Sequence, residues 1–171
     1  MQNILALIRD IPDFPSPGIL FKDITPLLAD YEAFNAVLDL MAAPYANSKI
    51  DYVAALDARG FIFGSAIARQ LHAGFIPLRK KGKLPHKKIC HSYSLEYGNN
   101  AIEIHIDAIK KADNVLIVDD LLATGGTLKA ACSLIEQLGG NIAGISLLIE
   151  LEFLKGRNLL EGYKIDSIIK Y

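Results

Sequence analysis

Short apolar segments that alternate with amphipathic helical patterns are the feature that most constrains the fold of this chain. Four runs have the length and composition of buried strands: YVAAL, FIPL, NVLIV and IAGISLLI. The segment after the first run places Phe63, Ile67 and Leu71 at helical spacing, and another helical pattern follows NVLIV. Such alternation predicts an α/β domain with a mostly parallel central sheet flanked by helices. One further run, AIEIHI, alternates strictly and predicts an antiparallel or half-exposed strand.

The remaining segments carry weaker signals. An opening helix is expected over roughly Asn3 to Arg9, and the proline-rich IPDFPSPGI after it is expected to be extended and stiff. The residues between Lys80 and Gly98 fit neither period and are rich in Lys, Gly, Pro and His. A loop of that length in a compact domain is usually functional or disordered.

Composition limits the class of protein. A chain of 171 residues with 51% hydrophobic residues favours one domain with a substantial core. The formal net charge of −1 gives no global basic field for nucleic acid or an anionic membrane, so neither partner is expected. No apolar run approaches the ~20 residues of a membrane span, and no signal peptide is expected. Two cysteines without a CxxC pair suit a reducing cytosol, so the protein is expected to be soluble and cytoplasmic.

Two adjacent acids follow the buried run NVLIV and precede a turn with two glycines, in VLIVDDLLATGGT. The strand is expected to end near Val118, so Asp119 and Asp120 would lie at its carboxyl end, where parallel sheets bind ligands. Because adjacent carboxylates repel and are costly to bury unpaired, hydroxyls, amides or a cation are expected to meet them.

The turn after these acids has the features of a phosphate cradle. A helix is expected from about Gly125, with Thr124 as a possible N-cap, so backbone N–H groups and the helix dipole would attract an anion. Glycines allow close approach of a phosphate, and the threonines offer hydroxyls. No GxxxxGK[ST] or GxGxxG occurs, which excludes a P-loop and the dinucleotide fingerprint. One phosphate cradle with two acids before it predicts a phosphorylated sugar as ligand.

The same residues resemble a known motif. VLIVDDLLATGGT resembles the phosphoribosyl-diphosphate (PRPP) motif of the type I phosphoribosyltransferases. Five other segments resemble the adenine-using members of that family: FPSPGILFKDITPLL, DARGFIFG, RKKGKLP, SYSLEYG and LKGR. The resemblance covers nearly the whole chain. It implies a single domain over residues 1–171, with a small N-terminal hood over about 1–30, a core over about 31–171 and a flexible catalytic loop over about 82–98.

The resemblance also implies a role for particular residues. The ribose and its 5′-phosphate would be bound by Asp119, Asp120, Ala123, Thr124, Gly125, Gly126 and Thr127. The diphosphate would be bound by Asp57, Ala58, Arg59, Gly60, Arg79 and Lys83. Adenine would be bound by Leu20, Phe21 and Lys22, with Leu20 and Lys22 acting through main-chain groups. The catalytic residues would be Glu96, Tyr97 and Arg59.

The implied reaction transfers the 5-phosphoribosyl group from PRPP to adenine and releases diphosphate. It would use Mg²⁺ held mainly by substrate oxygens and water, with no direct protein metal ligand. His86, Cys90 and His91 lack a zinc spacing. In the family an arginine equivalent to Arg79 reaches the neighbouring subunit's diphosphate, which implies a homodimer.

Three alternatives remain open at this point. One is a phosphoribosyltransferase for another base such as xanthine, which the hood segment argues against. Another is a PRPP-sensing regulator without catalysis, for which the chain offers no spare length for an effector module. The third is a phospho-receiver domain that uses the paired acids, which the glycine-rich turn disfavours.

Overall fold

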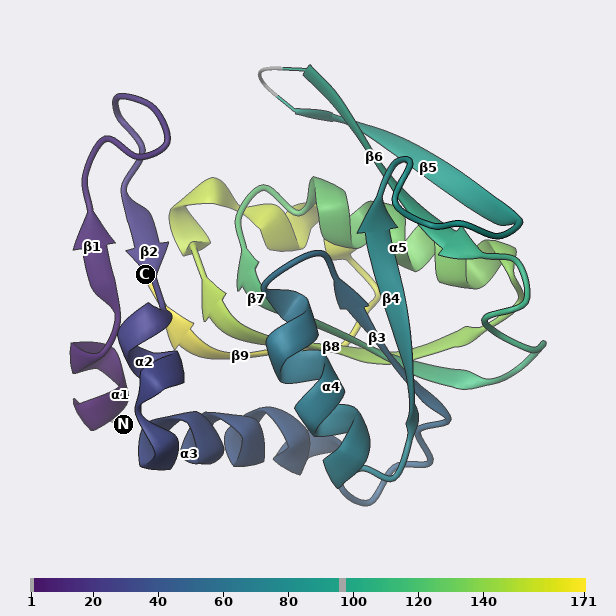
Figure 1. The fold of residues 1–171 in the computed structure, drawn as a ribbon, viewed down its shortest axis with the longest axis horizontal. Helices are drawn as coiled ribbons and strands as arrows, with labels where there is room; N and C mark the ends of the chain where they lie inside the picture. The colour runs from purple at the N-terminus through teal and green to yellow at the C-terminus, as the bar shows by residue number, and fades with distance from the viewer. Residues whose placement is uncertain (1, 96–97) are drawn as a thin grey trace. The chain divides into compact units, whose positions relative to one another are not determined.

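The computed structural model describes residues 2–95 and 98–171 as an α/β fold (Figure 1). The chain divides into two compact units, residues 1–40 and 41–171. Among the described residues, no helix combines the length and the apolar character needed to cross a bilayer.

The first unit contains three short helices and a two-stranded antiparallel sheet. Its elements are α1 (Gln2–Ala6), β1 (Arg9–Ile11), β2 (Phe21–Asp23), α2 (Thr25–Ala29) and α3 (Tyr31–Ala42), the last of which runs into the second unit. The opening helix therefore ends earlier than expected, because Arg9 pairs with Asp23 across β1 and β2 and joins it in a 2.8 Å ion pair. The expected stiff, extended segment is also wrong in part: backbone hydrogen bonds such as Ile19 N–H to Ser16 C=O fold its middle into turns.

The second unit contains a seven-stranded sheet in the order β5-β6-β4-β3-β7-β8-β9. Its strands are β3 (Tyr52–Leu56), β4 (Gly74–Lys80), β5 (Lys88–Leu95), β6 (Gly98–His105), β7 (Asn114–Leu122), β8 (Asn141–Glu150) and β9 (Ile165–Lys170). Its helices are α4 (Gly60–Gln70), α5 (Gly126–Gln137) and the short 3₁₀ helices η1 (Ala43–Tyr45), η2 (Glu152–Leu154) and η3 (Gly156–Leu160). Strands β4, β3, β7, β8 and β9 are parallel, and β5 and β6 form an antiparallel edge. The predicted mostly parallel sheet is confirmed.

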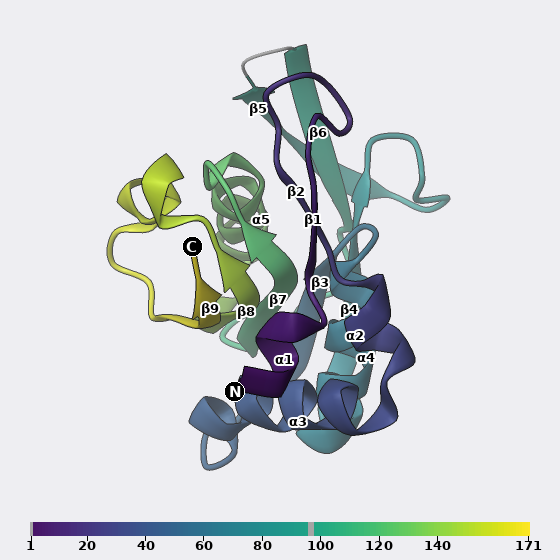
Figure 2. The ribbon, with the colours of Figure 1, turned by 90° about the vertical axis from the view of Figure 1, so that its left-hand side faces the viewer.

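Helices cover both faces of this sheet, and the alternation of β3 decides which helix meets which face (Figure 2). Gly64 of α4 lies against Ala55 and Val53, so α4 packs on the face to which these side chains point. Ala54 and Leu56 point to the other face and join the core cluster that contains the buried side of α5. Both side-chain faces of β3 are thus buried, which explains why YVAAL shows no polar alternation.

Strand β5 occupies much of the segment that was expected to be a long loop. Along Lys88–Tyr93 exposed and half-buried side chains alternate, and Ile89 and Tyr93 pack against the core. His91 is polar although its position is half-buried, so the hydrophobicity of the sequence does not show the alternation of the strand. An edge strand with one solvent-facing side tolerates such residues, so the loop expectation is wrong for this part of the chain.

Candidate active site

The site lies where the strand order reverses. From β3 the chain crosses to β4 on one side, whereas from β7 it crosses to β8 on the other. In open parallel sheets ligands bind in the crevice that this reversal leaves beyond the carboxyl ends of the two strands. The turns after β3 and β7 therefore face one crevice.

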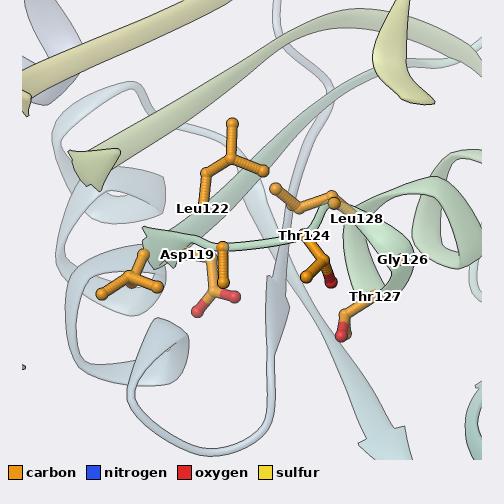
Figure 3. Close-up of a pocket in the computed structure, with 9 residues that line it drawn as sticks. Asp119, Leu122, Thr124, Gly126, Thr127 and Leu128 are labelled. Atoms are coloured by element: carbon orange, nitrogen blue, oxygen red, sulfur yellow. The ribbon is translucent and has the colours of Figure 1, made fainter. Parts of the chain in front are cut away.

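A hollow of about 140 Å³ lies at the end of β7 and the start of α5 (Figure 3). Its lining includes Asp119 and every residue of the predicted phosphate turn, Ala123, Thr124, Gly125, Gly126 and Thr127. Helix α5 begins at Gly126 after Gly125, which has φ +86° and takes the N-cap position without a side-chain hydrogen bond. The expectation that Thr124 is the N-cap is wrong. The Thr124 hydroxyl does not cap α5.

The two acids lie on opposite faces of one strand. Strand β7 continues to Leu122 instead of ending near Val118, because it remains paired with β8 as far as Glu150. Successive side chains of a strand alternate, so Asp119 faces the hollow while Asp120 is buried on the other side. There Asp120 Oδ2 lies 2.8 Å from Arg59 Nη2. The pair of acids thus forms two different environments.

Both environments raise the carboxyl pKa. Burial raises the pKa of Asp119 well above its usual range, and the negative charge of Asp120 raises it further. Burial also raises the pKa of Asp120, although the Arg59 guanidinium opposes this shift. The Oδ1 atom of Asp119 accepts a hydrogen bond of 2.9 Å from the Asp120 N–H. Because burial disfavours the charged form, the ionised carboxylate of Asp119 costs free energy unless further groups donate hydrogen bonds to it.

The predicted diphosphate loop, Asp57 to Gly60, packs directly against β7. A Cβ atom added to Gly60 would lie 2.8 Å from Asp119 Oδ1 and 3.0 Å from Val118 C=O, so a larger residue would force the loop or β7 to shift. The Asp57–Ala58 peptide bond is cis. Arg79, at the end of β4, donates from Nε to Asp57 Oδ2 at 3.1 Å. The structure thus places Arg59 and Gly60 against the two acids, at the carboxyl ends of β3 and β7.

Two residues outside the predicted set act on the phosphate turn. A Cβ on Gly156 would lie 2.2 Å from Ala123 C=O and 3.1 Å from Gly125 N, so the η3 backbone abuts the turn. On the opposite flank, the hydroxyls of Thr127 and Tyr93 are hydrogen-bonded at 3.0 Å. The segments LKGR and SYSLEYG contain these residues, but no local pattern in the sequence indicates what they contact.

The other predicted residues have varied surroundings. Lys83 is exposed in the turn after β4. In the first unit, Leu20 is exposed, Phe21 stacks edge-to-face on Phe14, and Lys22 is buried with Nζ 2.6 Å from Asp10 Oδ1. The predicted catalytic residues Glu96 and Tyr97 lie outside the described residues.

Comparison with known proteins shows the family of this chain. The sequence pattern of the phosphoribosyl transferase domain matches residues 27–168. An adenine phosphoribosyltransferase from Halothermothrix orenii is 57% identical over 99% of both chains.

Two solved structures are similar throughout. The crystal structure of adenine phosphoribosyltransferase from Thermoanaerobacter pseudethanolicus has a TM-score of 0.97 at 50% identity over 99% of both chains. That of the Saccharomyces cerevisiae enzyme, complexed with an imino-altritol bisphosphate and adenine, has a TM-score of 0.92 at 39% identity over 97% of this chain and 96% of that one. This chain is thus a member of the phosphoribosyltransferase family. Within that family it belongs to the adenine phosphoribosyltransferases.

Proposed function

We propose that the chain transfers the 5-phosphoribosyl group of PRPP to adenine, giving AMP and diphosphate in purine salvage. The observation that carries this proposal is the hollow at the end of β7. It combines one carboxylate, from Asp119, with a glycine turn at the start of a helix. A carboxylate accepts hydrogen bonds from vicinal hydroxyls, and a turn of this kind binds a phosphate. A ribose 5-phosphate group supplies both partners.

The chemistry is a displacement at the anomeric carbon through a state with positive charge on the sugar ring. Catalysis of this kind depends on positioning and electrostatics. The Asp119 carboxylate, beside the ribose, favours that charge. Donors from the ribose hydroxyls would also stabilise its ionised form and lower the raised pKa of this group.

We assign the leaving diphosphate to the loop from Asp57 to Gly60, with Arg79 and Lys83. In the free protein the two arginines of this set are held by acids, Arg59 by Asp120 and Arg79 by Asp57. Arginine forks bind phosphate oxygens as readily as carboxylates, so the diphosphate can take over these donors. The acids thus keep the arginines in position before the substrate arrives.

The residues of the crevice fit Mg²⁺ carried by the substrate. Within residues 2–95 and 98–171, no three His, Cys, Asp or Glu side chains gather to hold a metal ion. Asp57 and Asp120 are occupied by arginines, which leaves Asp119 as the acid that faces the hollow. Mg²⁺ suits such a site because it keeps several waters and binds through one or two carboxylates plus phosphate oxygens. When bound, it neutralises charge on the diphosphate.

We assign the base to main-chain groups of Leu20 and Lys22, with Phe21 beside the ring. An extended backbone offers alternating donors and acceptors to the N6-amino and N1 edge of adenine. Hypoxanthine has a carbonyl in place of the amine, so donors and acceptors would be mismatched. Glu96 is assigned to the proton that adenine loses from N9, and Tyr97 to the same loop; both rest on the family resemblance.

We further propose a cytoplasmic homodimer. Free Cys90 and Cys132 support a reducing compartment, and the family role of Arg79 supports a dimer. Light scattering after size-exclusion chromatography tests the dimer.

The decisive experiment incubates the protein with PRPP, Mg²⁺ and one nucleobase at a time, and detects the nucleotide by mass spectrometry. AMP from adenine, with hypoxanthine, guanine and xanthine at least about a hundredfold slower, is the expected outcome. Comparable use of another base contradicts the adenine assignment, and no nucleotide from any base contradicts the transferase assignment.

A further inference from the structure

We infer that the Glu150–Arg157 ion pair positions the phosphate turn without touching the substrate. This inference rests on the proposed function, since the ligand of the turn is taken to be the 5′-phosphate of PRPP. It concerns four structural parts: the turn from Ala123 to Thr127, the η3 backbone at Gly156, and the ends of β8 and β9.

The phosphate turn packs against the backbone of Gly156. A Cβ added to Gly125 would lie 2.5 Å from Gly156 C=O, and one added to Gly156 would lie 2.2 Å from Ala123 C=O. The two glycines therefore meet backbone to backbone, with no side chain between them. A displacement of Gly156 toward or away from the turn changes where the N–H groups of the turn can point.

Arg157, the next residue, fixes the position of Gly156. Its Nε and Nη2 donate to Glu150 Oε1 and Oε2 at 2.5 and 2.8 Å, which is a two-pronged contact. Its Nη1 donates to Ile165 C=O at 3.3 Å, and Nη2 also donates to Ser167 Oγ at 3.3 Å. The guanidinium thereby ties η3 to both β8 and β9.

Glu150 is suited to anchor this arrangement. It is 3% exposed at the end of β8, where it pairs in register with Leu122 of β7, and Ser167 Oγ donates to its Oε2. The hydrogen bonds from Arg157 lower the pKa of Glu150, so it stays ionised at neutral pH. A buried, ionised acid with a bidentate partner has one geometry, because leaving either charge without its partner is costly.

The test separates the two anion sites of the crevice. Binding to Glu150→Gln and Arg157→Lys is measured by titration calorimetry with two ligands. Ribose 5-phosphate tests the phosphate turn. Inorganic diphosphate with Mg²⁺ tests the loop from Asp57 to Gly60. Residues that act on a site through a neighbour typically change binding by about two- to thirtyfold. We expect a loss in that range for ribose 5-phosphate and less than a twofold change for diphosphate. In kinetics, KM for PRPP should rise by a similar factor while kcat changes less than threefold.

The matched control is Glu152→Gln in the same segment. It removes an exposed ion pair with Lys170 (Nζ–Oε1 2.8 Å) and leaves Glu150 and Arg157 intact, so both affinities should stay at wild-type values. Gly156→Ala provides a second route if the charge variants fold poorly, since its methyl group presses directly on the turn.

The outcomes are distinct. Equal loss of ribose 5-phosphate and diphosphate binding would assign the pair a general structural role and overturn the inference. Wild-type affinity for ribose 5-phosphate in both Glu150→Gln and Arg157→Lys would also overturn it. Wild-type protein that binds neither ligand would overturn the proposed function itself.

Discussion

At the scale of single residues, the sequence singled out Asp119 and Asp120 but did not show how their surroundings differ. Asp119 and Asp120 were expected to face one ligand together. Their side chains point to opposite faces of β7, and Asp120 is taken up by Arg59. The expectation depended on the strand ending at Val118, whereas pairing with β8 extends it to Leu122. That pairing is a long-range contact, and no local pattern in VLIVDD encodes it.

Asp119→Asn should lower kcat/KM for PRPP by about 10- to 150-fold, because a hydrogen bond to a charged group is worth about 1.5–3 kcal/mol. Steady-state kinetics with adenine in excess measure the change. The control is Asp107→Asn, which changes an exposed acid on the turn after β6. A loss below about threefold would show that Asp119 does not hold the ribose.

The same substitution should make the free protein more stable at neutral pH. Because the folded-state pKa of Asp119 is raised above its unfolded value, the folded state binds more protons and stability falls as pH rises through that interval. Asparagine carries no such cost. The free energy of unfolding of Asp119→Asn, measured in urea, should exceed that of the wild type at pH 8, and this advantage should shrink toward pH 4. A variant that is less stable at both pH values would contradict the direction of the shift.

Gly60→Ala should damage the site more than the fold. The added methyl group would meet Asp119 Oδ1 and the Val118 carbonyl, so the diphosphate loop or β7 must shift. Overpacking of this kind costs about 1–3 kcal/mol of stability, and a misplaced site loses about tenfold or more in kcat/KM. Gly64→Ala is the comparison, because in the same helix it meets Ala55 in the core. Equal kcat/KM values for the two variants would argue against a special role for Gly60.

At the scale of elements, the sequence predicted the centre of the sheet well and its edge poorly. The central strand β3 matches YVAAL residue for residue, because burial on both faces leaves a continuous apolar run. The apolar residues Phe34, Val37 and Met41 recur at helical spacing and likewise lie in α3. Strand β5 was missed because polar residues such as His91 occupy half-buried positions at an edge. Where burial is partial, hydrophobicity alone carries too little information.

The contact between β5 and α5 should contribute to phosphate binding. Tyr93→Phe keeps the ring that packs on the core and removes the hydroxyl that is bonded to Thr127. A neutral hydrogen bond is worth about 0.5–1.5 kcal/mol, so KM for PRPP should rise about two- to tenfold. Ser92→Ala changes the exposed neighbouring side chain and should leave KM as it is. An unchanged KM for Tyr93→Phe would mean that Thr127 binds the phosphate without orientation by this hydroxyl.

At the scale of the whole molecule, Glu150 joins β8 to β9 and η3, and the loss of its contribution should lower the stability of the protein in acid. Its folded-state pKa is lowered, so its contribution is fully present above the unfolded pKa and is lost as pH falls through the folded value. Urea unfolding should show wild type more stable than Glu150→Gln by about 1.5–3 kcal/mol at pH 7, with the difference shrinking below about pH 4.5. A difference that grows on acidification would contradict this sign.

The chain is synthesised from its N-terminus, so the phosphate turn is made before Gly156, against which it packs. Ribosomes add about 5–20 residues per second, so for a few seconds Ala123–Thr127 exists without the backbone on which it rests. The backbone of Gly156 is held in turn by its neighbour Arg157, which donates hydrogen bonds to Ile165 and Ser167 of β9. A chain that stops before β9, through a nonsense codon or a protease, contains every residue proposed to touch PRPP but lacks the hydrogen bonds from Arg157 to Ile165 and Ser167. Incomplete copies should therefore bind PRPP more weakly than complete ones.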